Sequence, residues 1–420
     1  MPRQHRPDTE DQLVAVIAEA VASERPLRLF GRGSRNGLGR PVACEDGLDL
    51  SAYSGIRLYE PEELVMRAGA GTPLTEIEAA LDAERQMLAF EPPHPGTLYG
   101  TGERGASIGG TFATNMAGPR RLQAGAARDH LLGFRAVSGR AEAFKAGGRV
   151  VKNVTGYDLC KLMCGSFGTL AAMTEVTFKV LPRPEKVWTV LGFGLSAAMA
   201  NRLLAEAAGS PHEVSGLCHL PADAAVASSV DFVSGAGASV TAIRVEGPGP
   251  SVEHRAGALR DLLAPHGDVE ILHTHRSLAL WREVRDLDLL TRPDDDRLIW
   301  RLSVTPTAGA QVLDDILRDM AGRGLLDWGG GLVWLELDAG PAEPDGGAEQ
   351  LREAIVRLSG TGHATLVRGP EALRRTIPVF QPQTPPLAAL SERIRRGFDP
   401  AGVLNPGRMV PVPDRAEREG

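Results

Sequence analysis

The chain has 420 residues, of which 43% are hydrophobic and 24% charged, and its formal net charge is −7. This composition is that of a soluble globular protein with room for two domains, and its acidic balance gives no reason to expect a nucleic-acid partner. No apolar run approaches the roughly 18 residues that cross a bilayer, and the polar segment Met1 to Glu10 lacks the apolar centre of a signal peptide.

The first 185 residues predict short strands and helices separated by glycine-rich loops. Apolar residues at helical spacing predict a helix over 10–24, and a strand over 27–30 follows Pro26. The later elements are a strand over 63–68, a helix over 74–84, a Gly- and Pro-rich loop over 91–107, a short helix from Ile108, strands over 131–137 and 140–151, a short helix over 157–164 and a strand over 169–181.

Strands alternate with helices from Val187 to about Arg368, which predicts antiparallel sheet with helices packed on one face. The strands are expected at 188–194, 239–245, 268–274, 298–305, 331–337 and 363–368, and the helices at 196–207, 252–264, 277–290, 308–322 and 348–359. We therefore expect an α+β protein with an N-terminal domain over 1–185, a cap domain over 186–375 and a C-terminal segment over 376–420 that contains a helix over 386–396.

The first glycine loop, Gly31 to Gly39, follows a strand and invites comparison with the dinucleotide-binding fingerprint. That fingerprint needs glycine at the third position, where a helix packs closely on the strand. Asn36 occupies this position and Gly37 comes one place late, while Pro41 interrupts any following helix. A Rossmann fold is therefore rejected.

Glycine-rich loops remain good anion cradles, because successive backbone N–H groups can converge on a diphosphate. Loop 31–37 has this composition, although taken alone it is equally compatible with an ordinary solvent turn. A second cluster, Ser107-Ile-Gly-Gly110, is followed by the polar residues Thr111, Thr114 and Asn115. Two such loops about 75 positions apart favour a long ligand held along its length.

Several segments taken together resemble the vanillyl-alcohol oxidase superfamily, whose fold is that of p-cresol methylhydroxylase (PCMH type). More narrowly, they resemble the FAD-binding E subunits of bacterial glycolate oxidases. The resemblance is dense over residues 10–190, patchy over the C-terminal 90 residues and faint over 190–325. It rests on the segments GRGSRNG, GAGTPL, EPPHPG, SIGGTFATNMAGPRR, VVKNVTGYDLCKLMCGSFGTL, KVLPRPE, DWGGGLVWL, GHAT and FDPAGVLNPGRM.

The resemblance implies a set of FAD-binding residues in three groups. The pyrophosphate would lie on Arg32, Gly33, Ser34, Arg35, Asn36 and Gly37, and Ser107, Ile108, Gly109 and Gly110 would lie near the pyrophosphate and ribityl chain. Thr114, Asn115 and Gly118 would approach the isoalloxazine ring, and Val176 would touch the adenine side. Some relatives attach FAD covalently through His or Cys, but loop 31–39 contains neither, so we expect non-covalent FAD.

Flavin oxidation of a 2-hydroxy acid needs a cation for the carboxylate and a base for the hydroxyl proton. The Gly-Asp-Gly-Asn-x-His segment in which related catalytic subunits resemble one another is absent here. Three positions remain as candidates, each with an ordinary structural alternative. His94 could lie above the flavin or pack in its loop. The pair Arg120–Arg121 could bind a carboxylate or a partner, or be exposed to solvent. Asn405 begins the segment Asn405-Pro406-Gly407, which resembles the tail that folds back on the FAD domain and could also be a simple turn after a helix.

Other polar and aromatic pairs have a structural interpretation that we favour. His273 and His275 on a strand would share a face, but no third metal ligand accompanies them, and His363 in the GHAT segment is as isolated. Cys160 and Cys164 would share one face of the helix over 157–164 and are read as buried small hydrophobic residues rather than a redox pair. Trp328 and Trp334 are expected to pack the cap or to shield the flavin.

Two functional hypotheses follow, with a third as the least favoured. The first is an FAD-bearing subunit of a glycolate (2-hydroxy acid) oxidase that works beside a catalytic flavin subunit and an iron–sulfur subunit. The four cysteines lack C-x-x-C spacing, so clusters would belong to the partner. The second is a self-sufficient FAD oxidase or dehydrogenase of a hydroxy acid or polyol, and the third is a structural subunit that has lost FAD. Widely spread cysteines also indicate a reducing compartment, so we expect a cytoplasmic protein that meets a membrane only through its complex.

Overall fold

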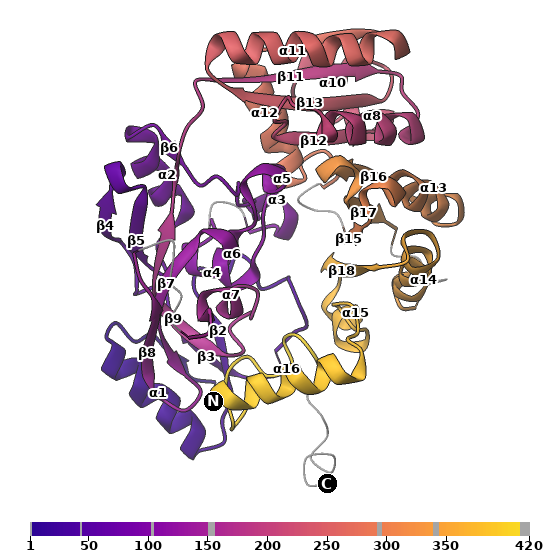
Figure 1. Ribbon diagram of the computed structural model, residues 1–420. Helices are drawn as coiled ribbons and strands as arrows, with labels where there is room; N and C mark the ends of the chain where they lie inside the picture. The colour runs from indigo at the N-terminus through magenta and orange to yellow at the C-terminus, as the bar shows by residue number, and fades with distance from the viewer. Residues whose placement is uncertain are drawn as a thin grey trace.

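The computed structural model describes residues 2–42, 44–101, 105–149, 156–291, 296–338 and 344–411. The molecule has two groups of sheets, and the chain passes from the first group to the second near residue 183 (Figure 1). The first group belongs to the N-terminal region (β1 to β10) and the second to the cap region (β11 to β18). Strand β10 (Leu181–Pro182) ends and β11 (Lys186–Phe193) begins on either side of residue 185, where we propose the domain boundary.

A three-stranded parallel sheet opens the N-terminal region, in the order β1-β3-β2. Its strands are β1 (Gln4–His5), β3 (Asp46–Asp49) and β2 (Leu27–Phe30). Helix α1 (Glu10–Ala22) precedes β2, and the Thr9 side chain caps it by accepting the N–H of Gln12. The buried face of α1 packs with β2, β3 and the ends of β7 and β9 in one core.

A five-stranded antiparallel sheet forms the second layer of this region, in the order β4-β5-β9-β7-β8. The strands are β4 (Ile56–Glu60), β5 (Val65–Gly69), β9 (Ala171–Lys179), β7 (Leu131–Ser138) and β8 (Ala143–Gly147). The core on its face includes residues of α2 (Leu74–Ala83), α4 (Ile108–Thr114) and α7 (Leu159–Met163). A small pair, β6 (Gln86–Met87) with β10, and the short helices α3 (Gly96–Tyr99), α5 (Arg121–Ala124) and α6 (Ala127–His130) complete it.

One eight-stranded antiparallel sheet carries the cap region, in the order β14-β11-β13-β12-β16-β17-β15-β18. The strands after β11 are β12 (Gly216–Leu220), β13 (Val240–Gly247), β14 (Val269–Leu272), β15 (Leu298–Val304), β16 (Gly322–Asp327), β17 (Leu332–Leu337) and β18 (Gly362–Arg368). A single paired position, His219 with Leu326, joins its two halves.

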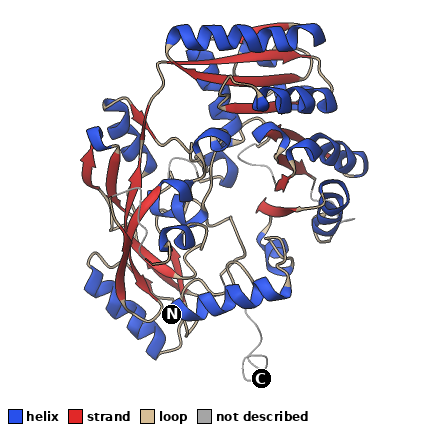
Figure 2. Cartoon of the chain, viewed as in Figure 1, coloured by secondary structure: helices blue, strands red, loops and turns tan. Residues whose placement is uncertain are grey.

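Helices cover both faces of the cap sheet, which corrects the expectation of helices on one face. Val190 packs with the core of α8 (Ala197–Gly209) and α11 (Gly249–Leu263), while its neighbour Leu191 packs on the opposite face with α12 (Thr274–Asp286). Helices α13 (Gly309–Asp319) and α14 (Ala348–Ser359) extend the first layer, and α9 (Ala222–Ala225) and α10 (Asp231–Ser234) share the second (Figure 2). The α12 face is the one turned toward the N-terminal region.

The C-terminal segment returns to the N-terminal region. Helix α15 (Glu371–Thr376) leaves the cap, and α16 (Pro385–Phe398) leads back across the molecule (Figure 1). Leu404 then forms a parallel bridge with Leu27, which extends the edge of the three-stranded sheet. In the described part of the chain, no helix is both long and apolar enough to span a membrane.

The α+β fold class is confirmed, while several individual elements differ from expectation. The strand expected over 268–274 ends at Leu272, and the helix expected over 308–322 ends at Asp319 because β16 begins at Gly322. The short helix covers Leu159–Met163 only. Strands β1, β3, β4, β6, β12 and β16 were not predicted. Residues 150–155, which include the end of the strand expected over 140–151 and most of the VVKNVTGYDL segment, lie outside the described residues.

Candidate functional site

A cleft lies in the N-terminal region, where β2 runs into the first glycine loop beside the start of α4. About 790 Å³ of space there is free of protein atoms, a volume that includes open solvent. It is lined by Leu29, Phe30, Gly31, Arg32, Gly33, Ser34, Arg35, Asn36, Leu50, Ala70, Ser107, Gly109, Gly110, Ala113, Thr114, Phe167, Gly168, Ala171, Ala172, Met173, Asn405 and Arg408. We call it the glycine-loop cleft.

The two glycine loops meet so closely that side chains would not fit between them. A Cβ atom on Gly31 would lie 2.8 Å from Ser107 Oγ, and one on Gly109 would lie 2.7 Å from the carbonyl oxygen of Ala70. Ser107 fixes the second loop, because its hydroxyl accepts the N–H of Gly110 at the start of α4. Gly33 adopts a φ of +72°, which other residues adopt only with strain. Backbone amides therefore face the cleft with few side chains in the way.

Arg35 is the buried cation of the cleft. Its Nη1 donates to Thr111 Oγ1 at 3.2 Å and its Nη2 to the Pro93 carbonyl at 3.2 Å, whereas its Nε has no hydrogen-bond partner among the described residues. Burial lowers the pKa of Arg35 to about 10, so the guanidinium remains charged at neutral pH. An anion in the cleft would satisfy the charge that these neutral oxygens leave uncompensated.

The C-terminal tail holds the first loop in place. Asn405 Oδ1 accepts the N–H of Leu29 and its Nδ2 donates to the Phe167 carbonyl, both at 2.8 Å. Arg408 Nη2 donates to the Arg35 carbonyl at 2.9 Å. The tail thereby ties the end of β2 to the glycine exit of the segment after α7.

A second, narrow pocket lies between the N-terminal region and the α12 face of the cap, with about 430 Å³ of space free of protein atoms, open solvent included, and we call it the interface cavity. Arg35 lines both cavities, so they meet at its side chain. The N-terminal side of the lining is Arg35, Pro93, His94, Pro95, Leu98, Met116, Ala117, Gly118 and Pro119, and the cap side is Val284, Arg285, Asp286, Leu287, Asp327, Leu332 and Trp334.

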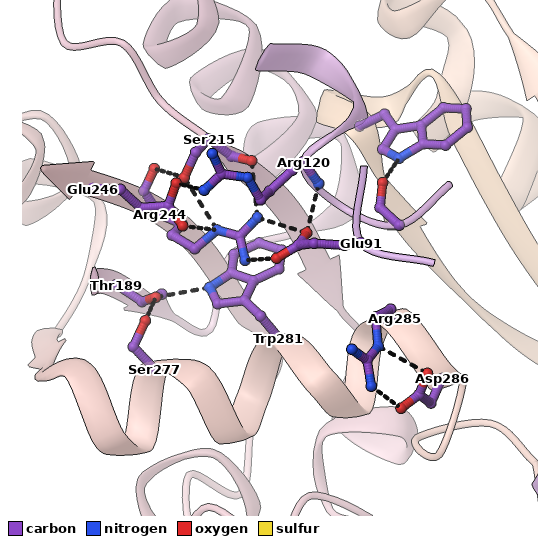
Figure 3. Close-up of polar contacts among 12 residues, drawn as sticks. Glu91, Arg120, Thr189, Ser215, Arg244, Glu246, Ser277, Trp281, Arg285 and Asp286 are labelled. Carbon is purple, nitrogen blue, oxygen red and sulfur yellow. Dashed lines mark hydrogen bonds and ion pairs between the residues drawn. The ribbon is translucent and has the colours of Figure 1, made fainter. Parts of the chain in front are cut away.

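A buried ion network joins the two regions beside this cavity (Figure 3). Arg244 is fully buried on β13 and donates through Nη1 and Nη2 to the two carboxylate oxygens of Glu91, at 2.9 and 3.0 Å. Its Cζ lies 4.6 Å from the centre of the Trp281 ring. The Arg120 side chain pairs with Glu246, while its backbone N–H donates to Glu91 at 2.8 Å. Arg120 is thus engaged in holding the cap and does not face either cavity.

Asp327 is the buried carboxyl group of the interface cavity. Only 2% of its surface is exposed, and its Oδ1 accepts the N–H of Trp328 at 2.7 Å. Burial raises the pKa of Asp327 to about 7, against the weaker effect of that hydrogen bond. The burial of Asp327 beside a cavity could not be predicted from the DWGGG segment alone, because a lone aspartate close to a glycine run is typical of surface turns.

Most of the residues expected to bind the cofactor lie together at the glycine-loop cleft. The lining includes Arg32, Gly33, Ser34, Arg35, Asn36, Ser107, Gly109, Gly110, Thr114 and also Asn405. Gly118 lines the interface cavity. Ile108 and Val176 are core residues, Gly37 packs against the ring of Tyr99, and Asn115 ends α4 and accepts the N–H of Arg128, so these four line neither cavity.

The histidine candidates are separated from one another. His94 lines the interface cavity, but its Nε2 lies 3.0 Å from Glu78 Oε1, and its backbone N–H donates to Asp286. His273 and His275 do not share a strand face as expected, because the strand ends at Leu272 and they begin α12. Within the described residues, no group of three His, Cys, Asp or Glu side chains could hold a metal ion.

The cysteine and tryptophan candidates occupy buried positions. Cys160 lies in α7 and Cys164 just beyond its end, and burial raises their pKa values to about 11 and about 12, so both are poor nucleophiles at neutral pH. Trp334 lines the interface cavity, and Trp328 donates its indole N–H to the Gly118 carbonyl at 3.1 Å. The residues missed by sequence reasoning include Arg408, Asp327, Glu91 and Arg244. The first three stood in recognised segments (FDPAGVLNPGRM, DWGGGLVWL and EPPHPG) without being singled out, and Arg244 stood in none.

Comparison with known proteins places this arrangement in context. The model of the family described as "FAD binding domain" matches residues 4–147. The glycolate oxidase subunit GlcE of Escherichia coli is 35% identical over 405 residues, which are 96% of this chain and 97% of GlcE. The D-lactate dehydrogenase of Archaeoglobus fulgidus is 34% identical over 180 residues, which are 42% of this chain and 38% of that protein.

Solved structures share the fold at low sequence identity. The 4-ethylphenol oxidase of Gulosibacter chungangensis superposes with a TM-score of 0.70 at 15% identity, covering 98% of this chain and 90% of that one. An alkyldihydroxyacetonephosphate synthase superposes with a TM-score of 0.66 at 15% identity, covering 96% and 75%. The PCMH-type fold is therefore confirmed.

The residues of the glycine-loop cleft fit FAD. Close-packed glycines expose backbone donors, the buried Nε of Arg35 lacks a partner among the described residues, and the cleft continues toward the cap at that residue. A dinucleotide with a diphosphate at its centre needs such a set of donors. With the FAD-binding family match and the relatives above, FAD is the cofactor of this chain.

Proposed function

The chain belongs to the FAD-dependent oxidoreductase family of the glycolate oxidase subunit GlcE, and from this premise we propose that it is the FAD-binding subunit of a glycolate (2-hydroxy acid) oxidase complex. The complex would oxidise glycolate to glyoxylate together with a catalytic flavin subunit and an iron–sulfur subunit. The observation that carries the proposal is the similarity to GlcE, because it extends through both the N-terminal and cap regions.

The structure supports a division of labour between the two cavities. The glycine-loop cleft would hold the cofactor, with Arg32 to Asn36 and Ser107 to Gly110 at the diphosphate and Thr114 toward the ring. When bound, FAD supplies the electron acceptor for a carbon–hydrogen bond next to a hydroxyl group. The interface cavity is the space between the two regions in which a small acid would be shielded from water, because the Glu91–Arg244 pair holds the cap against the N-terminal region.

A self-sufficient oxidase is the second candidate, and one observation favours it. Asp327 lines the interface cavity as a buried carboxyl group whose pKa of about 7 suits a general base near neutral pH. A hydroxy acid that enters this cavity would meet a group able to accept its hydroxyl proton. The two candidates differ in whether the chain alone transfers electrons from substrate to its cofactor.

Anaerobic addition of glycolate to the purified FAD-loaded chain separates the two candidates. We expect the visible absorbance of the oxidised cofactor to persist with the chain alone, and to bleach with glyoxylate formation once the other two subunits are present. Bleaching of the chain alone would favour the self-sufficient oxidase. If the three subunits together gave no bleaching and no glyoxylate, the proposal would be overturned. We further propose that the complex is cytoplasmic.

A further inference from the structure

Two arginines from different regions stack on one tryptophan at the interface between the regions. The Arg121 guanidinium, on α5, lies 4.7 Å from the centre of the Trp328 ring, and that of Arg301, on β15, lies 5.1 Å from it. The indole is fixed by its N–H, which donates to the Gly118 carbonyl of the N-terminal region. The two arginines therefore share this ring only when the cap is docked on the N-terminal region.

The cap sheet explains where Arg301 points. Arg301 pairs with Trp334 on β17 and with Thr365 on β18, so these three side chains share the face turned toward the N-terminal region. The Arg301 guanidinium also lies 5.9 Å from the centre of the Trp334 ring, and Trp334 lines the interface cavity. The two arginines do not line this cavity themselves, but they lie next to it, because Arg301 contacts the lining residue Trp334 and Trp328 is hydrogen-bonded to the lining residue Gly118.

The charge of this pair is not balanced inside the protein. Neither guanidinium makes a hydrogen bond or an ion pair with any residue that the structure describes, and both are half-buried. Burial and, to a smaller extent, the neighbouring charge of Arg121 lower the pKa of Arg301 to about 10. Two like charges on one ring are unfavourable unless an anion joins them, because buried charges are normally paired.

The acidic groups nearby do not supply that anion. Asp327 attracts Arg301, but burial raises its own pKa to about 7, so it is only partly ionised at neutral pH. Asp129 attracts Arg121 while its carboxylate accepts the N–H of Ala126 and lies 3.5 Å from Lys161 Nζ. The two cations are therefore left to attract a ligand.

We propose that Arg121 and Arg301 form the binding site for the carboxylate of the substrate acid, closed by docking of the cap on Trp328. The choice of a small 2-hydroxy acid rests on the proposed function, whereas the binding of a small carboxylate does not. Planar guanidinium groups suit a carboxylate because each can present two parallel N–H donors to it. This chain would then contribute substrate recognition as well as its cofactor.

Oxalate tests the site without turnover, because it is a two-carbon carboxylate like glycolate, with a second carboxylate in place of the hydroxymethyl group, and has no carbon–hydrogen bond to oxidise. Oxalate added to the FAD-loaded chain should perturb the visible spectrum of the cofactor and release heat in calorimetry, with one site per chain. Arg301→Gln and Arg121→Gln keep a planar group on Trp328 but remove the charge, and each should raise the Kd for oxalate at least tenfold. Glycolamide, the neutral amide of glycolate, should not compete.

Arg276→Gln is the matched control, because Arg276 also stacks on an aromatic ring of the cap, 4.8 Å from the centre of Phe232, and lies on the exposed surface. It should leave the oxalate affinity unchanged. All variants are compared at equal FAD content. Arg301→Lys keeps the charge; it replaces Arg301→Gln if that variant does not fold, and it should bind oxalate with intermediate affinity. Wild-type protein that does not bind oxalate, or glutamine variants that bind it as tightly as wild type, would overturn the proposal. Oxalate binding without glycolate oxidation by the complex would instead overturn only the proposed function.

Discussion

Arg244 of the cap closes on Glu91 of the N-terminal region through two parallel hydrogen bonds, of 2.9 and 3.0 Å. The guanidinium is fully buried and the carboxylate is four-fifths buried, and a second carboxylate, that of Glu246, lies 3.6 Å from Arg244 Nε. Glu91 also accepts the backbone N–H of Arg120. One carboxylate therefore fixes both the cap and the segment that precedes Arg121.

Replacing Glu91 with Gln should separate the cap from the N-terminal region. The change removes the bidentate partner of the buried Arg244 and leaves it only the more distant carboxylate of Glu246, 3.6 Å from its Nε, which should cost about 3 kcal/mol. Thermal unfolding should show a lower Tm, and limited proteolysis should cut faster between the regions. Glu10→Gln is the control, because its ion pair with Arg135 lies on the surface and should contribute less than about 1 kcal/mol. Equal effects of the two substitutions would contradict the assignment.

Removing the side chain of Asn405 should weaken cofactor retention. Asn405→Ala loses two hydrogen bonds, to Leu29 and Phe167, at a cost of about 2 kcal/mol in stability. FAD release during gel filtration should increase, because the loop after β2 loses its support. Asn405→Asp keeps the acceptor for the Leu29 N–H but not the donor, and should give an intermediate rate. A variant with alanine that retains FAD as wild type does would refute the role of the tail.

A methyl group at Gly109 should displace the second glycine loop. The added Cβ would lie 2.7 Å from the Ala70 carbonyl oxygen, and the backbone cannot yield there without moving the start of α4. We expect Gly109→Ala to be purified largely without FAD. Gly257→Ala tests the specificity of the effect, because Gly257 lies within α11 with open space around it. It should retain FAD and gain roughly 0.5–1 kcal/mol in stability.

Asp327 should make stability depend on pH in a specific direction. Its pKa is raised from 3.8 to about 7 by burial, with Glu91 raising it and Arg244 and Arg301 lowering it. The folded state therefore binds the proton more tightly, so this contribution to stability is complete below about pH 4 and is lost as the pH rises through 7. Asp327→Asn should be more stable than wild type at pH 8, by on the order of 2 kcal/mol.

The difference between Asp327→Asn and wild type should shrink toward zero near pH 4, where wild type is protonated. Thermal melts over this range measure it, with Asp8→Asn on the surface as control. A constant difference at every pH would contradict the shifted pKa.

The sequence was sufficient to predict that the two glycine loops lie together at one cleft, because the pattern that marks them is local. Gly31 to Asn36 and Ser107 to Gly110 are contiguous loops, and contiguous glycines that must approach a ligand leave a recognisable composition. The alternation of strands and helices likewise predicted the α+β class. Strands β12 and β16 escaped prediction because each is short and buried on both faces, so neither shows strong alternation.

The interface could not be predicted, because its partners are far apart in the sequence. Arg121 and Arg301 are 180 positions apart and meet only through Trp328. Arg120 and Arg121 looked equivalent as neighbours, yet one pairs with Glu246 and the other faces Trp328. Which arginine meets which cap residue depends on how the cap packs on the N-terminal region, and no local sequence pattern indicates that packing.

The FAD content of the purified chain tests the central claim most directly. The chain is precipitated with acid, and the flavin in the supernatant and in the pellet is quantified against the protein. We expect one FAD per chain, released completely into the supernatant, because loop 31–39 offers no His or Cys for a covalent bond. A colourless chain that cannot be reconstituted with FAD, or flavin that stays in the protein pellet, would contradict it.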